Sequence, residues 1–177
     1  MKRILAIVDE IYEDLELWYP RIRLEEEGWN VVVAGPEKGR EFRGKHGYPC
    51  RADAAIDDME TSGFDALLVP GGFAPDKLRR LPHVKDLVRR FDQEGKLIAF
   101  ICHAGWVPIS AGILKGRTAT SVGAIRDDMV NAGVRWLDEE TVVDGNLLSS
   151  RTPADLAHFG RGMVEWLKVG APVGVGR

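Results

Sequence analysis

The chain has 177 residues, 45% of them hydrophobic, and its 24 Lys and Arg against 27 Asp and Glu give a formal net charge of −3. This length suits one domain with a substantial core, and the scattered basic residues lack the clustered patch that nucleic-acid binding needs. No run approaches the ~20 apolar residues that span a bilayer, and the apolar run at residues 4–8 is too short for a signal peptide. We therefore expect a cytoplasmic protein with no nucleic-acid or membrane partner.

The two cysteines, Cys50 and Cys102, are too few for a disulfide scaffold. The chain has no CxxC pair and no clustered His/Cys spacing of the kind that holds structural zinc. We therefore expect no metal site and no resident cofactor.

Short apolar runs alternate along the chain with amphipathic runs of helical length. The predicted strands are residues 3–8, 31–34, 66–69 and 97–101, and the predicted helices are residues 13–27, 82–94, 106–111 and 152–167. Near-continuous apolar strands, each followed by a helix, are typical of a parallel sheet that is covered on both faces. The pattern therefore predicts the α/β class.

The last third of the chain departs from this alternation. Residues 142–143 and 147–148 flank the turn sequence at 144–146, which predicts a β-hairpin. No repeat, linker or low-complexity segment divides the chain. We expect one domain over residues 1–168, followed by a loose tail rich in Gly, Pro and Val over residues 169–177.

Three segments directly follow predicted strands: residues 9–13, 71–76 and 102–106. In open α/β sheets, ligands bind beyond the carboxyl ends of the strands. These three segments should therefore converge on one edge and carry the chemistry.

Cys102 lies where the fourth predicted strand turns directly into a helix. This context resembles a nucleophile elbow, whose strained turn exposes the side chain above the sheet. The free amides of a helix start favour an anion, so we expect a lowered thiol pKa and a side chain that acts as nucleophile or oxidation sensor. The alternative is a buried core cysteine. The adjacent His103 does not decide between them, because neighbouring helical side chains diverge by ~100°.

Two further features lie at the same edge. The backbone at Gly71 and Gly72 can approach a ligand closely, and the Gly72 amide together with the His103 amide could hold an oxyanion, although most glycine pairs are simple turns. Glu13 opens the first helix. It either complements the helix start or points across the strand ends to share a proton with Cys102.

In this order and spacing, the segments resemble the ThiJ/PfpI superfamily, and within it the PfpI-type intracellular cysteine peptidases. The resemblance covers about residues 3–167. The matching stretches are residues 12–20, 44–48, 64–72, 101–103, 109–114, 127–133, 143–146 and 149–156.

The resemblance implies a flavodoxin-like three-layer sandwich. By motif position it implies Cys102 as the nucleophile, His103 as its catalytic partner and Glu13 as the carboxyl that contacts the thiol. The amides of Gly72 and His103 would be the oxyanion donors, beside Gly71.

The resemblance also implies a homo-oligomer, a dimer or a hexamer, with a shared active site. In PfpI-type peptidases a Glu of the neighbouring subunit completes the triad. Here the corresponding residue is Asp76, one methylene shorter. Two further positions depart from the pattern of these peptidases. After the Cys-His pair they commonly have Gly-Pro, whereas this chain continues through Ala104 and Gly105 to the bulky Trp106, which we expect to narrow the site. Val122 stands where a Tyr is usual.

Two functions of different class remain open. The first is a stress-protective enzyme in which Cys102 attacks the carbonyl of a peptide, of a small aldehyde such as methylglyoxal, or of its adduct on protein amines. These substrates correspond to a peptidase, a cofactor-free glyoxalase and a deglycase. The second is a redox-sensing protein whose Cys102 is oxidised to the sulfenate or sulfinate with little turnover.

Overall fold

In the computed structural model, which describes residues 1–170, one seven-stranded sheet forms the centre of the fold. Its strands are β1 (Arg3–Ile7), β2 (Asn30–Gly35), β5 (Ala54–Ala55), β6 (Ala66–Val69), β7 (Leu97–Ile101), β10 (Thr141–Asp144) and β11 (Leu147–Ser150). The strand order is β10-β11-β7-β6-β1-β2-β5, and every pair is parallel except β10 with β11. The predicted parallel sheet and the predicted β-hairpin are both confirmed.

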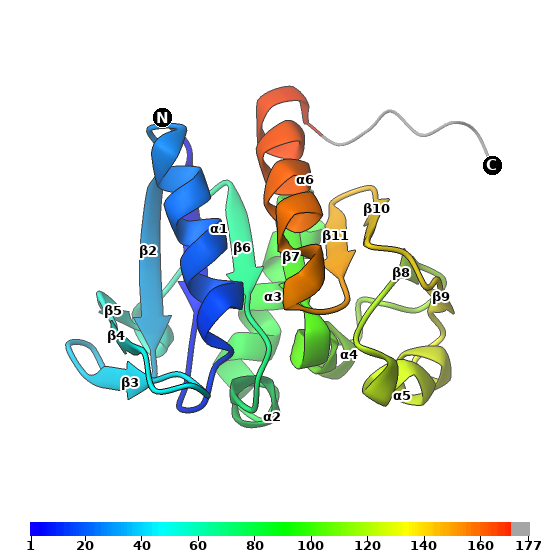
Figure 1. Ribbon diagram of the computed structural model, residues 1–177, viewed down its shortest axis with the longest axis horizontal. Coiled ribbons are helices and arrows are strands. Elements are labelled where there is room, and N and C mark those ends of the chain that lie inside the picture. Colours follow the sequence, from blue (N-terminus) through cyan, green and yellow to red (C-terminus); the bar gives the residue numbers. More distant parts are fainter. Residues whose placement is uncertain (171–177) are drawn as a thin grey trace.

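Helices cover both faces of this sheet (Figure 1). Helices α1 (Asp14–Glu26) and α6 (Leu156–Val169) pack side by side on the face toward the viewer. Helix α3 (Pro82–Gln93) packs against the other face and against the short α4 (Trp106–Ala111). The arrangement is the predicted flavodoxin-like three-layer sandwich.

Strands β6 and β7, at the centre of the sheet, are apolar throughout because both of their faces are covered. Every residue of β6, β7 and β11 is buried. Burying one such aliphatic side chain contributes roughly 1.5–3 kcal/mol, so these strands supply much of the stability that fixes the carboxyl edge. Helix α3 buries Val84, Leu87, Val88 and Phe91, whose helical spacing places them on one face.

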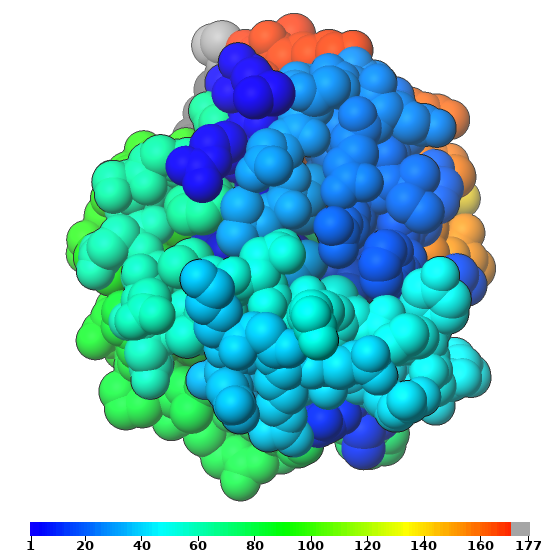
Figure 2. Space-filling view, turned by 90° about the vertical axis from the view of Figure 1, so that its left-hand side faces the viewer, coloured from blue at the N-terminus to red at the C-terminus, as the bar shows by residue number. Residues whose placement is uncertain are grey.

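Several short elements have no counterpart in the predicted set. One of them is the edge strand β5. The others include the ribbon of β3 (Glu41–Arg43) and β4 (Pro49–Arg51), the pair of β8 (Thr118–Ala119) and β9 (Arg135–Trp136), and the helices α2 (Ala74–Leu78) and α5 (Arg126–Asn131). Figure 2 shows that the cyan segment between β2 and β6, which includes the β3–β4 ribbon, covers the lower part of the side of the molecule nearest β5. These elements are too short for periodicity to reveal them.

The predicted last helix begins later than expected. A 3₁₀ turn over Pro153–Asp155 precedes α6, and Thr152 makes no side-chain cap to it. Helix α6 extends to Val169, and residues 171–177 of the predicted tail lie outside the described residues. Across the described part of the chain, no helix combines the length and apolar character that a membrane crossing requires.

Candidate active site

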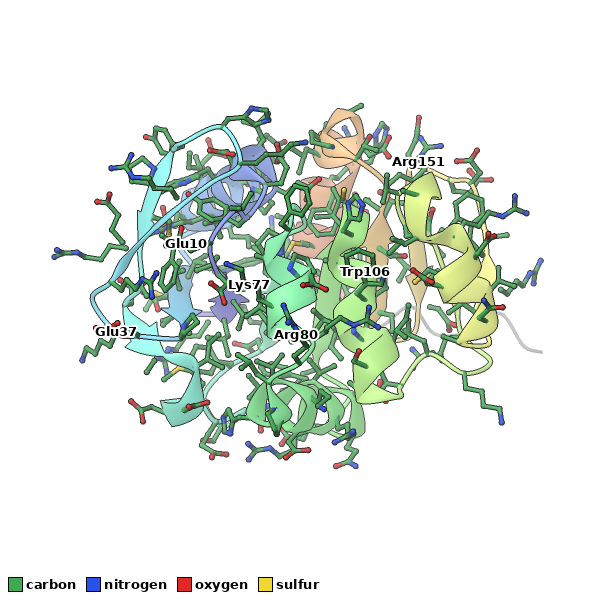
Figure 3. All side chains as sticks on the ribbon, turned by 90° about the horizontal axis from the view of Figure 1, so that it is seen from below. Glu10, Glu37, Lys77, Arg80, Trp106 and Arg151 are labelled. Atoms are coloured by element: carbon green, nitrogen blue, oxygen red, sulfur yellow. The ribbon has the colours of Figure 1, made fainter. Side chains whose placement is uncertain are left out.

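A cavity of about 280 Å³ opens at the carboxyl edge of the sheet, the edge that Figure 3 shows from below. All three segments that follow predicted strands contribute to it, as does a loop that joins β3 to β4. The lining residues are Glu13, Glu16, Lys45, His46, Gly72, Phe73, Cys102, His103, Trp106 and Pro153.

Cys102 directly follows β7 and begins a 3₁₀ turn, Cys102–Gly105, that leads into α4. Its backbone φ is 63°, and the only other positive φ at a non-glycine residue of the described chain belongs to Ile11. A non-glycine residue in this region is strained by roughly 1–3 kcal/mol, and such strain gathers at functional sites. The elbow geometry is therefore present. The side chain is 9% exposed, so it lies at the floor of the cavity rather than standing free above the sheet.

The carboxyl that contacts the thiol is Glu16, and the expectation that Glu13 fills this position is wrong. Glu13 is the N-cap of α1, and its extended backbone turns the side chain back so that Oε2 accepts the Glu16 N–H at 2.9 Å. Glu16 lies one turn further, on the buried side of α1 with Leu17, and is fully buried. Apolar residues of α1 such as Leu15 and Ile22 are exposed, so the sequence pattern gave no signal that separates Glu16 from Glu13.

Glu16 is held from the opposite segment. Its Oε2 accepts the Gly71 N–H at 2.7 Å, and its Oε1 has no hydrogen-bond partner within residues 1–170. Burial, followed by the charge of Glu13, raises the pKa of Glu16 to about 8. The buried carboxyl is therefore largely protonated at neutral pH.

The expected lowering of the thiol pKa is also wrong. Burial, followed by the negative charge of Glu16, raises the pKa of Cys102, although N–H groups of His103 and Gly72 directed at the sulfur oppose the rise. The amides do favour the thiolate, as a helix start should, but desolvation outweighs them. Two negative charges disfavour each other in this pocket, so the Glu16–Cys102 pair retains at least one proton near neutral pH.

The glycine pair leaves room for these contacts. A Cβ on Gly71 would lie 2.5 Å from Glu16 Oε2 and 2.8 Å from Cys102 Cβ. Gly72 has a φ of 79°, and a Cβ there would lie 2.5 Å from the Ile11 carbonyl oxygen. Without side chains at either position, the Gly72 backbone can approach the sulfur.

His103 places its Nδ1 3.3 Å from Cys102 Sγ, so the two neighbouring side chains do meet. Burial, and then the charge of Lys45, lower the pKa of His103, so the ring is neutral at neutral pH and can accept a proton. Trp106 packs at an angle against the His103 ring with centroids 5.3 Å apart, and its Nε1 donates to Asp128 at 2.8 Å. The indole therefore forms a fixed wall of the cavity.

Asp76 lies on α2, outside the cavity lining. Its carboxylate pairs with Arg80 at 2.7 Å, one turn along the chain, and both side chains are more than half exposed. Arg80 is labelled in Figure 3. The role of Asp76 at the His103 of a neighbouring subunit stays a prediction.

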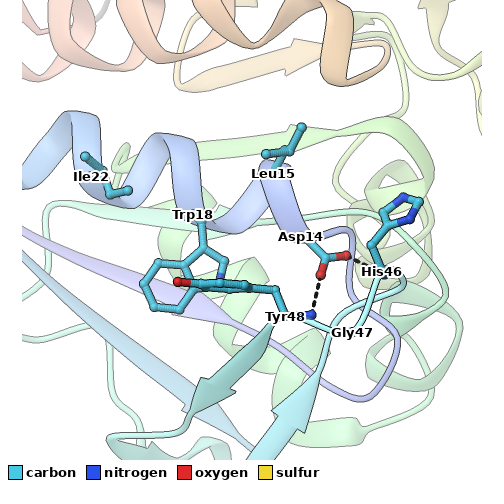
Figure 4. Close-up of a pocket in the computed structure, with 7 residues that line it drawn as sticks. All are labelled: Asp14, Leu15, Trp18, Ile22, His46, Gly47 and Tyr48. Carbon is cyan, nitrogen blue, oxygen red and sulfur yellow. Dashed lines mark hydrogen bonds between the residues drawn. The ribbon is translucent and has the colours of Figure 1, made fainter.

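The loop that carries Lys45 and His46 is anchored by Asp14. The two Asp14 carboxylate oxygens accept the N–H groups of His46 and Tyr48, each at 2.8 Å (Figure 4). Side-chain ligand atoms of Glu13, Asp14 and His46 lie within 4.8 Å of one another. Because Asp14 already accepts two backbone bonds, this cluster is explained by anchoring the loop over the cavity.

Residues 2–166 match the model of the DJ-1/PfpI family. This chain belongs to the DJ-1/PfpI family. The resemblance that the sequence motifs indicated is therefore confirmed. Among curated relatives in the family, "Deglycase PfpI" of Pyrococcus furiosus is 48% identical over 166 residues, which cover 94% of this chain and 99% of the relative. "Putative cysteine protease YraA" of Bacillus subtilis is 41% identical over 167 residues, with coverage of 94% and 99%.

Solved structures of DJ-1/PfpI proteins share the fold. A two-domain protein from Anabaena variabilis, with a DJ-1/ThiJ/PfpI-like and a ferritin-like domain, gives a TM-score of 0.93 at 40% identity, covering 96% of this chain and 49% of that one. DJ-1beta of Drosophila melanogaster gives a TM-score of 0.89 at 29% identity, with coverage of 96% and 91%.

Proposed function

We propose that this protein is a stress-protective, cofactor-free cysteine enzyme that acts on 2-oxoaldehydes such as methylglyoxal and on their adducts with amines. The observation that carries this proposal is the constellation around Cys102: a positive φ, His103 Nδ1 at 3.3 Å, the Glu16 carboxyl, and two N–H groups at the sulfur. The relatives named deglycase from Pyrococcus furiosus and Pyrococcus horikoshii, 48% and 46% identical to this chain, add support.

The chemistry needs no outside oxidant. His103 takes the Cys102 thiol proton, the sulfur bonds to the aldehyde carbon, and the N–H groups of Gly72 and His103 stabilise the oxyanion until His103 returns the proton to it. His103 then moves a proton from the hemithioacetal carbon to the adjacent carbonyl, through an enediol. The product is a thioester of a 2-hydroxy acid. Water hydrolyses it to the free acid and restores the thiol, so one carbon is oxidised as its neighbour is reduced.

The size of the cavity favours a small carbonyl over a long peptide. Its volume of about 280 Å³ lies at or below the lower end of the range for ligand pockets, and Trp106 closes one side. Peptide hydrolysis, which the name of the Bacillus subtilis relative suggests, would use the same nucleophile and oxyanion donors. It is therefore the natural competing substrate class in any assay.

A second candidate rests on Glu16 itself. A protonated, fully buried carboxyl beside a thiol can donate a hydrogen bond to an oxidised sulfur, which favours a redox-sensing role with little turnover. Intact mass after mild peroxide treatment would report the added oxygen atoms on Cys102.

The test is a turnover assay with methylglyoxal and with a fluorogenic peptide. We expect the wild type to convert methylglyoxal to the hydroxy acid and Cys102→Ala to be inactive. Cys50→Ala is the matched control, because Cys50 is 2% exposed on β4, away from the cavity lining. Turnover of methylglyoxal by Cys102→Ala at the wild-type rate would contradict the proposal, and turnover of the peptide alone would assign a peptidase.

A further inference from the structure

One phenylalanine of this chain is exposed, and it lies at the active-site cavity. The chain has six phenylalanines, all within residues 1–170, and five of them are buried. Phe73 is 61% exposed and lines the cavity. Its backbone is fixed there, since its N–H donates to the Ile11 carbonyl at 2.8 Å. A phenyl ring left in water forgoes the free energy of burial, and a bound ligand that covers the ring recovers it.

Trp106, labelled in Figure 3, presents a second aromatic surface to the same cavity. Its Nε1 donates to Asp128 at 2.8 Å, and its ring centroid lies 5.3 Å from that of His103. The Arg79 guanidinium lies 5.5 Å from the indole centroid. A ring that is already held by three contacts loses little conformational entropy when a ligand packs against it. The indole is therefore preorganised for binding.

The two aromatic residues flank the groups that hold the reacting carbonyl. Gly72 and His103 carry the N–H groups that are directed at the Cys102 sulfur. Phe73 follows Gly72 directly in the chain. Trp106 packs against the His103 ring. When the sulfur bonds to an aldehyde carbon, the substituent on the adjacent carbon therefore has aromatic surface within reach.

The cavity also has room for an aromatic substituent. Its volume is about 280 Å³, whereas an apolar cavity of roughly 150 Å³ already holds benzene. Methylglyoxal, with a methyl group beyond its two carbonyls, leaves much of this volume unfilled. A phenyl ring in place of the methyl group adds apolar surface for Phe73 and Trp106 to cover, and pairs of aromatic rings gain free energy beyond that of burial.

We propose that Phe73 and Trp106 are specificity-determining residues that bind an aromatic group on the ketone carbon, so that the site prefers aryl 2-oxoaldehydes, of which phenylglyoxal is the simplest, over methylglyoxal. This inference rests on the proposed function and deepens it by naming the substituent that the cavity selects.

The reaction follows the route already described. The Cys102 sulfur bonds to the aldehyde carbon of phenylglyoxal, and His103 moves the proton of that carbon to the ketone carbon through an enediol. Water then cleaves the thioester, so that phenylglyoxal and one water give mandelic acid and the free thiol. The phenyl ring takes no part in the bonds that form or break. Phe73 and Trp106 therefore act by binding and orienting the substrate.

The test measures kcat and KM for phenylglyoxal and for methylglyoxal in wild type and in Phe73→Ala. We expect kcat/KM of wild type to be at least about tenfold higher for phenylglyoxal, since one methylene in an apolar pocket is already worth about tenfold. In Phe73→Ala this preference should fall about fivefold, through a higher KM for phenylglyoxal with kcat unchanged. The intrinsic reactivities of the two aldehydes cancel when the variant is compared with wild type.

Leu15→Ala is the matched control, because Leu15 is 56% exposed on α1, outside the cavity lining. It should keep the wild-type preference. Trp106→Leu keeps an apolar side chain but removes the ring that packs on His103. We expect this variant to lose rate with both aldehydes, and to lose more with phenylglyoxal.

An unchanged preference in both cavity variants, or a wild type that prefers methylglyoxal, would overturn the inference. A wild type that turns over neither aldehyde would refute the proposed function instead. Binding then tests the aromatic rings alone, through protection of Cys102 from iodoacetamide by benzamide and by acetamide, neither of which reacts with the thiol. We expect benzamide to protect wild type better than acetamide does, and to lose that advantage in Phe73→Ala. Equal protection by the two amides in wild type would contradict the inference.

Discussion

Glu16 lies against Cys102 at the floor of the cavity, where its burial raises its own pKa to about 8 and its negative charge raises the pKa of the thiol. The pair therefore couples the protonation of the site to the stability of the fold.

Glu16 should make the wild type less stable as the pH rises from about 5 to about 8. Its pKa is raised in the folded state, so the native protein binds a proton that the unfolded chain has released in this range. The stabilisation is complete below the unfolded value of 4.5 and is lost as the pH passes the folded value. The free energy of unfolding, measured with urea at several pH values, should fall more steeply in wild type than in Glu16→Gln. Identical slopes would refute the raised pKa.

Iodoacetamide should modify Cys102 before Cys50. Burial raises the pKa of both thiols, for Cys50 to about 11, so the pKa values give Cys102 no advantage. The difference is access, because Cys102 lines a cavity while Cys50 packs in the core at 2% exposure. Peptide mass spectrometry over time should show faster labelling of Cys102, with rates that rise with pH. Faster labelling of Cys50 would mean that the cavity is closed in solution.

Gly72→Ala should destabilise the protein more than Gly112→Ala. Both glycines have a positive φ, 79° and 77°, so both substitutions carry the same backbone strain of about 1 kcal/mol. Only at Gly72 would the new methyl group also meet backbone, 2.5 Å from the Ile11 carbonyl oxygen. We expect an additional loss of about 1–3 kcal/mol, typical of overpacking, in chemical denaturation. Equal losses would show that the Tyr12 segment can move away.

Asp76 should act across a subunit boundary if the active site is shared. The protein should then sediment as a dimer or hexamer at micromolar concentration, without monomer. Asp76→Ala mixed with His103→Ala after subunit exchange should recover activity that neither variant has alone, because one interface would regain both residues. Asp76→Glu, which adds a methylene, should retain activity. A fully active monomer would refute the shared site.

The sequence by itself determined the layers of the fold and the place of the chemistry. The runs that became β6 and β7 are apolar at every position, and β1 is apolar after Arg3, because both faces of the sheet are covered. This pattern can be recognised without knowing what covers the sheet. Cys102 could also be identified from a local pattern. Where a strand turns directly into a helix, the first residue after the strand lies at the carboxyl edge of the sheet. Family motifs supported both conclusions.

Only the tertiary structure decided which carboxyl serves the thiol and which direction the pKa shifts. Glu13 and Glu16 are separated by less than one helical turn, and their roles depend on the extended backbone of the cap, which sends Glu13 back to the helix start while Glu16 points at Gly71. Likewise, the sequence indicates that Cys102 lies at a helix start, whose free amides lower the pKa of a thiol. The burial that outweighs this effect and raises the pKa of Cys102 arises from segments distant in the chain. Local sequence patterns specify where the backbone turns. The pKa values of groups at a buried site depend on burial and on neighbouring charges, and only folding brings those neighbours together.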